Sequence, residues 1–264
     1  MERLPISVCL ISNSDPRLAM ALDSVKDWVA EIIVVLNDDT DEATERLALD
    51  RGAKVFREKW QGQIAQKQSL LEKAAQPWIL LLDSDEAVTD ELRASIHRLL
   101  ANPAECQKYA AWRLPRLTEY CGQWIRHGEW YPDLKLRLWK RGQASMGGVP
   151  PHDKLIVNGP TGRLQGPLLH RSQETTRMRW TKAYTYAEAF DHGLAAAGKR
   201  VTLLDLFLRP PWRFFRSYIL RLGLLDGWRG YSIACMTAAY TYLRYSMAYE
   251  RQAAAKPKAT PNQP

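Results

Sequence analysis

Three acidic side chains follow the apolar run 78–82, where the sequence reads Asp83-Ser84-Asp85-Glu86. A carboxylate that points into a cleft at the end of a buried strand can ligate Mg²⁺ or Mn²⁺, with water and diphosphate oxygens filling the other positions. The cation then offsets charge on a departing phosphate. The alternative is a polar turn whose acids favour the N-terminus of the next helix. The position directly after a buried run favours the metal site.

Two further groups of polar residues follow apolar or helical signals in the same half of the chain. Asn37 and Asp38 could hydrogen-bond a base or a ribose, whereas Asp39, with Glu42 three residues later, is expected to cap the next helix. Lys67 lies near the start of a predicted helix and could reach a phosphate, helped by the positive end of that helix. The alternative for Lys67 is an exposed helix lysine.

Two segments of the middle region carry other candidate groups. His152 and Asp153 follow two prolines, and a carboxylate or imidazole on a rigid loop is a possible general base; a solvated polar loop is the alternative. The segment 122–133, which includes Trp130, and the arginines after it, including Arg137, interleave aromatic and basic side chains. Such a surface suits a sugar or phosphate, single-stranded nucleic acid, or an amphipathic strand pair with an exposed basic face.

Alternating strand and helix signals must position these groups in the first half of the chain. The expected strands and helices alternate at 6–11, 18–29, 31–36, 40–50, 54–56, 64–75, 78–82 and 88–100. This order predicts an α/β fold with a mainly parallel sheet, whose ligands bind at the carboxyl ends of the strands. The region 109–170 reads as irregular structure that completes the sheet, with short strands at 109–113 and 135–139.

The last third of the chain has helical signals. We expect a helix at 178–197 and a helical region at 200–248, broken at Pro210-Pro211 and around Gly223 and Gly227. Apolar and aromatic rows there are mixed with arginines, which fits helices lying on an anionic bilayer or helices packing on the sheet domain. The expected organisation is a catalytic domain at 1–175, a helical region at 176–252 and a disordered tail at 253–264.

Composition limits the class of protein. The chain has 264 residues and a formal net charge of +8, which suits nucleic acid, a phosphorylated substrate or an anionic membrane surface. Its four cysteines are scattered without metal-ligand spacing, so we expect reduced thiols in a cytosolic compartment. The sequence shows no signal-peptide pattern and no transmembrane run.

Taken together, these motifs resemble the family-two glycosyltransferases with the GT-A fold, and within them the lipopolysaccharide-core β-1,4-glucosyltransferases and their relatives. The resemblance extends from Ile6 to about Tyr249. Its carriers are Ile6-Ser7-Val8, Glu31-Ile32-Ile33-Val34-Val35, Gly62 with Gln66-Lys67, Trp78 to Glu86, Trp130-Tyr131-Pro132-Asp133, His152-Asp153-Lys154-Leu155 and Gly223-Leu224-Leu225-Asp226-Gly227.

This resemblance implies an inverting sugar transfer from a nucleotide-sugar, in the first place a UDP-sugar, with Mn²⁺ or Mg²⁺ as cofactor. Asp85 would ligate the metal, and Asp153, which follows a histidine where relatives usually carry His-Glu, would be the base. Asn37 stands where the family commonly has aspartate. The residues expected at the nucleotide-sugar are Asn37, Asp38, Lys67, Asp83 and Ser84, and those expected at the acceptor are Trp130, Arg137 and His152.

The implied acceptor is a glycolipid of lipopolysaccharide core or another cell-envelope glycan. We therefore expect a cytoplasmic protein, peripheral on the inner face of the cell membrane through its C-terminal helices, with no nucleic-acid partner. Sugar transfer to a polyprenyl phosphate and nucleotidyl transfer are enzymatic alternatives. A basic nucleic-acid-binding protein without catalysis is the alternative from another class, although such a protein has no use for an acidic cluster at a strand end.

Overall fold

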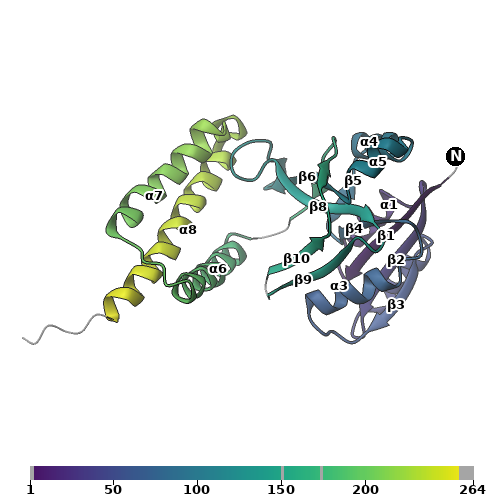
Figure 1. Ribbon diagram of the computed structural model, residues 1–264, viewed down its shortest axis with the longest axis horizontal. Coiled ribbons are helices and arrows are strands. Elements are labelled where there is room, and N and C mark those ends of the chain that lie inside the picture. The colour runs from purple at the N-terminus through teal and green to yellow at the C-terminus, as the bar shows by residue number, and fades with distance from the viewer. Residues whose placement is uncertain (1–2, 150–151, 173–174, 256–264) are drawn as a thin grey trace, which may run out of the picture. The chain divides into compact units, whose positions relative to one another are not determined.

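The computed structural model describes residues 3–149, 152–172 and 175–255, and the chain divides into two compact units (Figure 1). The sheet unit comprises Met1–Glu119 and Pro132–Ser172, and the helical unit comprises Tyr120–Tyr131 and Gln173–Pro264. The helical unit thus contains a segment from the middle of the chain in addition to the C-terminal helices that the sequence predicts.

The sheet unit is built on one mixed sheet with the strand order β3-β2-β1-β4-β8-β6-β12-β5. The first four strands in this order are parallel, β8 is antiparallel to β4 and β6, and β12 is parallel to β6 and antiparallel to β5. The strands are β1 (Leu4–Ser12), β2 (Val29–Asn37), β3 (Lys54–Glu58), β4 (Trp78–Asp83), β5 (Glu86–Val88), β6 (Ala111–Tyr120), β8 (Asp133–Lys140) and β12 (Leu168–His170). The expected α/β fold with a mostly parallel sheet is confirmed.

Additional elements surround this sheet. A short strand, β11, runs parallel to β6, and β9 and β10 form a separate antiparallel hairpin. The bounds are β9 (Ala144–Val149), β10 (His152–Val157), β11 (Thr161–Arg163), α1 (Leu18–Asp23), α2 (Glu42–Leu49), α3 (Gln63–Glu72), α4 (Asp90–Leu100) and α5 (Pro103–Lys108).

The central strands are apolar without alternation because both faces of the sheet are covered. On one face, Leu80 and Leu82 of β4 pack in a core with residues of α1 and α4. On the other face, Ile79 and Leu81 pack with Leu70 of α3 and with apolar residues of the β9–β10 hairpin. The buried strands fix the positions of the turns that follow them, and these turns carry the polar candidates.

The capping residue of α2 differs from the expected one. Asp41, and not Asp39, is the N-cap, and its side chain accepts a hydrogen bond of 2.7 Å from the backbone N–H of Thr44. The turn after β2 is two residues longer than the capping-box pattern assumes, because the backbone N–H of Thr40 donates to the carbonyl of Asn37.

The helical unit contains three long helices and two short irregular turns. The described elements are β7 (Gln123–Trp124), α6 (Thr176–Ala196), α7 (Leu203–Phe215), the π turn η1 (Arg216–Leu220), the 3₁₀ turn η2 (Gly223–Asp226) and α8 (Gly227–Ala254). The predicted break around Gly223 and Gly227 is confirmed, since Leu222 has a left-handed φ of +55°. Gly223 and Gly230 approach so closely that a Cβ on Gly230 would collide with the Gly223 carbonyl.

The predicted break at Pro210-Pro211 is wrong, because α7 continues through both prolines. A proline inside a helix costs about 3 kcal/mol, since it removes a backbone donor and crowds the preceding turn. Here α7 begins with a capping box between Thr202 and Asp205, and it packs along α8. We attribute the persistence of the helix to these compensating interactions.

The segment 120–131 is tied into the helical unit by two carboxylates. Asp226 accepts hydrogen bonds from the backbone N–H groups of Arg126 and His127, at 3.4 and 2.9 Å. Glu129 forms ion pairs with three arginines of the α7–η2 region, described below. In addition, Ile125 is fully buried against Ile233 of α8. The segment is therefore part of the core of this unit.

Candidate active site

The register of the parallel strands brings two of the predicted polar turns to one edge of the sheet. In β1, Ile11 lies opposite Asp83 of β4, and the next residue, Ser12, lies opposite Leu36 of β2. Asn37 and Asp83 therefore flank the carboxyl end of β1, and two strand spacings separate them, about 10 Å. This is the edge at which open α/β sheets bind ligands.

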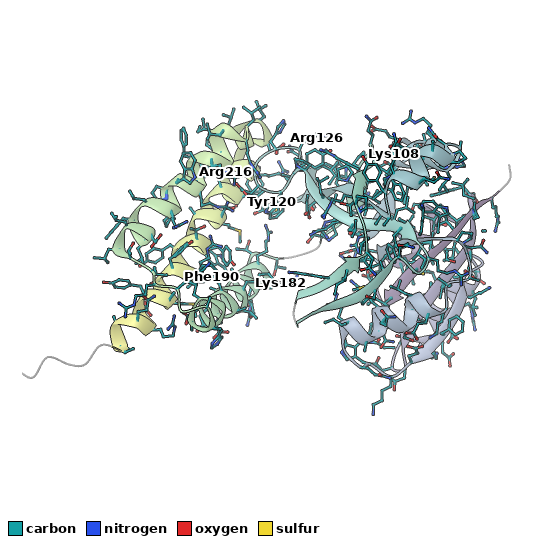
Figure 2. All side chains as sticks on the ribbon, in the orientation of Figure 1. Lys108, Tyr120, Arg126, Lys182, Phe190 and Arg216 are labelled. Carbon is teal, nitrogen blue, oxygen red and sulfur yellow. The ribbon has the colours of Figure 1, made fainter. Side chains whose placement is uncertain are left out.

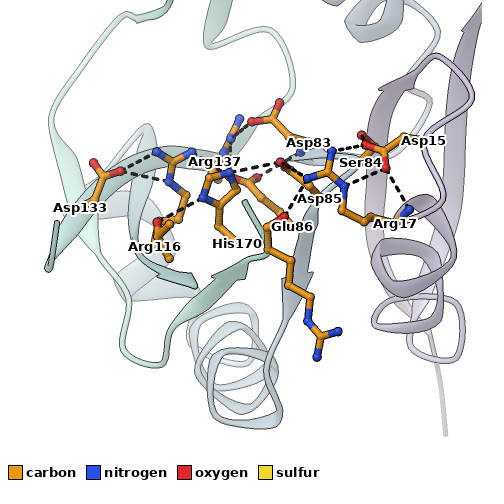
Figure 3. A network of polar contacts seen from close by, with 12 residues as sticks. Asp15, Arg17, Asp83, Ser84, Asp85, Glu86, Arg116, Asp133, Arg137 and His170 are labelled. Carbon is orange, nitrogen blue, oxygen red and sulfur yellow. Dashed lines mark hydrogen bonds and ion pairs between the residues drawn. The ribbon is translucent and has the colours of Figure 1, made fainter. Parts of the chain in front are cut away.

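Asp83 lies between two cations, of which Figure 3 labels Arg137. The Arg137 guanidinium donates to its Oδ2, and Lys67 Nζ is 3.4 Å from its Oδ1. Lys67 is only 3% exposed, so it is not the exposed helix lysine of the alternative interpretation. Burial raises the pKa of Asp83, but Arg137 and Lys67 outweigh it and hold that pKa well below its usual range. Asp83 is thus a fixed negative charge.

Beneath Asp83, the carboxylate of Glu86 is completely buried. It accepts from Arg137 Nη2 at 2.6 Å and from the backbone N–H of Asp83 at 3.1 Å, and Arg116 Nη1 is 3.5 Å away. Burial and the neighbouring Asp83 charge raise the pKa of Glu86. Arg137 is 6% exposed and joins both acids, so its guanidinium supports the acidic turn from below.

The second acid of the turn, Asp85, contacts His170, a residue that the sequence did not single out as a candidate. Asp85 Oδ2 is 3.2 Å from His170 Nε2, and the other ring nitrogen, Nδ1, is 3.1 Å from Thr118 Oγ1. Arg17 Nη1 also lies 3.3 Å from Asp85 Oδ2. Backbone pairing sets this arrangement, because His170 at the end of β12 lies opposite both Glu86 and Thr118.

Two rows of ion pairs continue from this centre (Figure 3). On one side, Arg17 Nε binds Asp15 Oδ1 at 2.8 Å, and Ser84 donates to Asp15 Oδ2 at 2.7 Å. On the other side, Arg116 binds Asp133 at 2.7 Å. The acidic turn is therefore interleaved with cations from distant parts of the sequence, and it forms an ordered network with alternating charges.

The Asp85–His170 pair has a spacing that fits a divalent cation. Two ligands about 2.1 Å from an octahedral cation and at right angles to each other lie about 3 Å apart, close to the spacing seen here. One carboxylate and one imidazole form a donor set that suits Mn²⁺. Among the described residues, no three His, Cys, Asp or Glu side chains form a metal site. The pair fits a cation whose other ligands are water and diphosphate oxygens.

The other predicted residues lie at different places in the chain. Asn37 ends β2 and Asp38 follows it, with its backbone N–H donating to Glu58 at 3.0 Å and its side chain exposed. Trp130 belongs to the helical unit, where its ring centroid lies 5.6 Å from that of Tyr120. Arg179 stacks over the Tyr120 ring at 4.0 Å. Trp130 of segment 122–133 thus packs inside the helical unit, whereas Arg126 is exposed and Asp133 begins β8 of the sheet unit.

The side chains of His152 and Asp153 lie outside the described residues. Their backbone forms the start of β10, where His152 pairs with Val149 and Asp153 pairs with Gly148. The predicted roles of these two residues remain predictions.

Comparisons with known proteins identify relatives of this chain. The family model described as "Glycosyl transferase family 2" matches residues 8–140. A glycosyltransferase of Rickettsia typhi is 28% identical over 251 residues, which cover 90% of this chain and 85% of the relative. A glycosyltransferase of Rickettsia conorii is 28% identical over 250 residues, covering 90% and 88%.

Among solved structures, a mannosyltransferase from Pyrobaculum calidifontis, in complex with GDP-mannose and Mn²⁺, is similar in fold. It is 13% identical, and the match covers 97% of this chain and 77% of the mannosyltransferase with a TM-score of 0.50. At this identity the likeness shows the fold alone, and the fold is the GT-A fold expected from the sequence.

Proposed function

Because this chain belongs to glycosyl transferase family 2, we propose that it moves a sugar from a nucleotide-sugar to a glycolipid acceptor with inversion at the anomeric carbon. The chain is a glycosyltransferase, which removes the non-catalytic nucleic-acid binder from consideration. The observation that carries the proposal is the acidic turn Asp83–Glu86, fixed by buried cations at the carboxyl edge of the sheet.

The donor would lie along this edge. Asn37 and Asp38 at the end of β2 would contact the base or ribose, and Asp83 and Ser84 would hold the sugar-nucleotide from the end of β4. Lys67 lies beside Asp83, so its ammonium group can bind a diphosphate oxygen through a charge-assisted hydrogen bond. Arg137 is assigned to a positioning role, because it is buried under Asp83 and Glu86.

Asp85 and His170 would hold Mn²⁺ or Mg²⁺, with Thr118 fixing the imidazole through its other nitrogen. Such a cation supplies stabilisation of charge on the leaving diphosphate. Arg17 is bound to Asp85 through the same oxygen that faces His170, so it would have to release that oxygen when a cation binds.

The transfer itself is a single displacement. The acceptor hydroxyl oxygen forms a bond to the anomeric carbon while the bond from that carbon to the diphosphate oxygen breaks. The hydroxyl proton passes to the Asp153 carboxylate, and the bonding electron pair leaves with the nucleoside diphosphate. General-base assistance of this kind contributes about 10²- to 10⁴-fold in rate.

The first test is a thermal-shift screen of UDP- and GDP-sugars with and without Mn²⁺, followed by measurement of nucleoside diphosphate release. A donor should raise the melting temperature of the wild type more with Mn²⁺ than without it. Asp85→Asn and His170→Ala should remove the metal-dependent part of the shift, whereas Glu91→Gln, an exposed acid on α4, should preserve it. A metal-dependent shift that survives in both site variants would contradict the assignment.

The proposed acceptor is a membrane glycolipid, and the support for it is the exposed surface of α7. Leu204, Phe207 and Leu208 are 67%, 70% and 61% exposed on a helix that also carries arginines. Such helices lie in the interface of anionic bilayers. Among the described helices, none combines the length and apolar character needed to cross a bilayer.

Flotation with liposomes tests this membrane association. At low salt the protein should float with vesicles containing phosphatidylglycerol and stay at the bottom with pure phosphatidylcholine. Phe207→Ser should weaken flotation, and Tyr242→Ser, at an aromatic position on α8 that is 53% exposed, is the control. Wild-type protein that stays in the soluble fraction with anionic vesicles would refute the peripheral membrane role.

A further inference from the structure

A cavity of about 280 Å³ lies in the helical unit, where α7 packs along α8. Four of its six lining residues are arginines, and none is acidic. The lining residues are Arg209, Trp212, Arg213, Arg216, Thr241 and Arg244. Figure 2 marks Arg216 in this part of the unit. We call this cavity the arginine pocket.

Helical spacing explains why the arginines converge. Arg209, Arg213 and Arg216 are four and three residues apart, so they form one row along α7 and the turn that follows it. Thr241 and Arg244 are three residues apart on α8 and form the facing wall. Four guanidinium groups therefore line one small cavity.

The neighbouring carboxylates do not balance this charge. Glu129, whose side chain is 13% exposed, lies 3.2, 2.8 and 3.4 Å from Arg213, Arg216 and Arg221. Arg209 pairs with Asp205 one turn earlier on α7. Two carboxylates, Glu129 and Asp205, thus form ion pairs with four arginines. Arg244 is a fifth arginine beside them.

Arg244 has no carboxylate within ion-pair distance among the described residues, and its guanidinium lies 4.7 Å from the ring centre of Phe190 and 5.1 Å from that of Tyr245. Its Nε is buried without a hydrogen-bond partner among these residues, and the same is true of Nε of Arg213. A buried N–H that lacks a partner costs about 1–3 kcal/mol. Both arginines that carry these unpartnered donors line the cavity.

From these observations we propose that the arginine pocket binds a phosphate group, either a monoester or a diphosphate. Planar guanidinium forks match the oxygen geometry of phosphate, and four of them suit a doubly charged group better than a single carboxylate. The proposal deepens the proposed function and rests on it, because a phosphate on the acceptor lipid would place that lipid on the helical unit.

The carrier that the structure favours is a lipid. On α7, Trp212 lies between the arginine row and the exposed apolar row that contains Leu204 and Leu208, as the helical period of 3.6 residues requires. A lipid could therefore contact the apolar row with its chains while its phosphate enters the pocket. A soluble phosphate compound would use the pocket alone.

The experiment measures full-length protein binding to vesicles of phosphatidylcholine containing phosphatidic acid, at about physiological ionic strength. In parallel, inorganic phosphate and glycerol 3-phosphate are titrated in a thermal-shift assay. The variant is Arg244→Gln, which leaves no carboxylate without its partner, and the matched control is Arg221→Gln, which removes the same charge outside the pocket. Arg244→Lys replaces Arg244→Gln if the latter loses its helical circular dichroism.

We expect Arg244→Gln to weaken binding to phosphatidic acid vesicles at least fivefold and Arg221→Gln less than twofold. If both variants weaken vesicle binding equally, the protein binds through its net charge alone. That result would overturn the proposal that the arginine pocket is the phosphate site. A thermal shift by soluble phosphates that Arg244→Gln abolishes, without vesicle binding, would support the pocket and overturn the lipid carrier.

The donor thermal shift with Mn²⁺ is recorded for every variant. A normal donor shift in Arg244→Gln, together with lost phosphate binding, separates the pocket from the sugar-nucleotide site. Absence of phosphate binding in the wild type with a normal donor shift would overturn the pocket and leave the glycosyl-transfer proposal standing. Absence of a donor shift with intact phosphate binding would overturn the glycosyl-transfer proposal and leave phosphate binding by the pocket standing.

Discussion

Replacing Arg137 with methionine is expected to destabilise the sheet unit strongly, because this guanidinium neutralises two acids at once. Asp83 and Glu86 both bind Arg137, and Glu86 is completely buried. Removing one member of a buried ion pair costs about 3–5 kcal/mol, since the partner charge stays behind without compensation. Lys67 still faces Asp83 and Arg116 still faces Glu86, so we expect the lower end, about 3 kcal/mol.

This loss would lower the melting temperature by about 6–12 °C, given about 2–4 °C per kcal/mol for a unit of this size. The effect should also depend on pH. Without Arg137 the pKa values of both carboxyl groups rise in the folded state, and an acid with a raised pKa favours folding at low pH and loses that contribution as pH rises. The Arg137→Met variant should therefore be less destabilised at pH 5 than at pH 8.

Urea denaturation and calorimetry measure these effects in the wild type and in four variants, one of which is Glu86→Gln alone. Arg113→Met, at an exposed position on β6, is the control and should change stability by less than about 0.5 kcal/mol. Arg137→Met combined with Glu86→Gln should recover at least about 1 kcal/mol relative to Arg137→Met, because one unpaired charge is gone. A loss below about 1 kcal/mol, or a double variant whose loss is the sum of the single losses, would refute the argument.

Three other predictions can be tested directly. Asp153→Asn should lower the rate of sugar transfer by about 10²- to 10⁴-fold with unchanged donor binding in calorimetry, and an unchanged rate would remove Asp153 as the base. The carboxyl group of Asp41 should titrate by NMR with a pKa of about 2, below its ordinary 3.8, because Ser14 and Thr44 donate hydrogen bonds to it. Its contribution to stability should persist above pH 4 and disappear as the pH falls towards 2. An NMR titration midpoint near pH 4 would contradict the capping geometry. Thr202→Ala should destabilise α7 by about 1 kcal/mol in urea denaturation, and an unchanged midpoint would show that the capping box does not hold the helix through its prolines.

The parts of the fold that the sequence predicts are those with local signals. The run 78–82 is apolar at every position because β4 is covered on both faces, and the acids after it lie at the sheet edge for the same reason. The family resemblance was confirmed by the match over residues 8–140. The apolar run predicts where β4 ends, and the end of β4 fixes where the acids lie, so the sequence predicts this part of the site.

The arginines and the histidine of the site have no comparable local signal. Arg17, Arg116 and His170 come from three separate segments, and only the pairing of β12 with β5 and β6 brings His170 to Asp85. His170 does end a short apolar run, so the rule that strand ends carry function could have selected it. No sequence rule predicts that β12 inserts beside β5, because 80 positions separate Val88 from its partner Leu168.

Helix signals failed where tertiary interactions outweigh local preference. Pro210 and Pro211 read as a helix end, yet α7 passes through them with Pro210 buried. In the turn after β2, the spacing of Asp39 and Glu42 matches a capping box, but α2 begins later in the chain and its N-cap is Asp41. Both errors come from judging a residue by its neighbours in sequence alone.

The discontinuous make-up of the helical unit has a consequence for biosynthesis. Ile125 leaves the ribosome long before Ile233, the α8 residue that covers it. A nascent chain therefore carries Tyr120–Tyr131, with Ile125 uncovered, until α8 has been translated. Chains truncated after β12 would keep Ile125 permanently exposed, so they should require chaperones or aggregate, whereas chains that include α8 bury it.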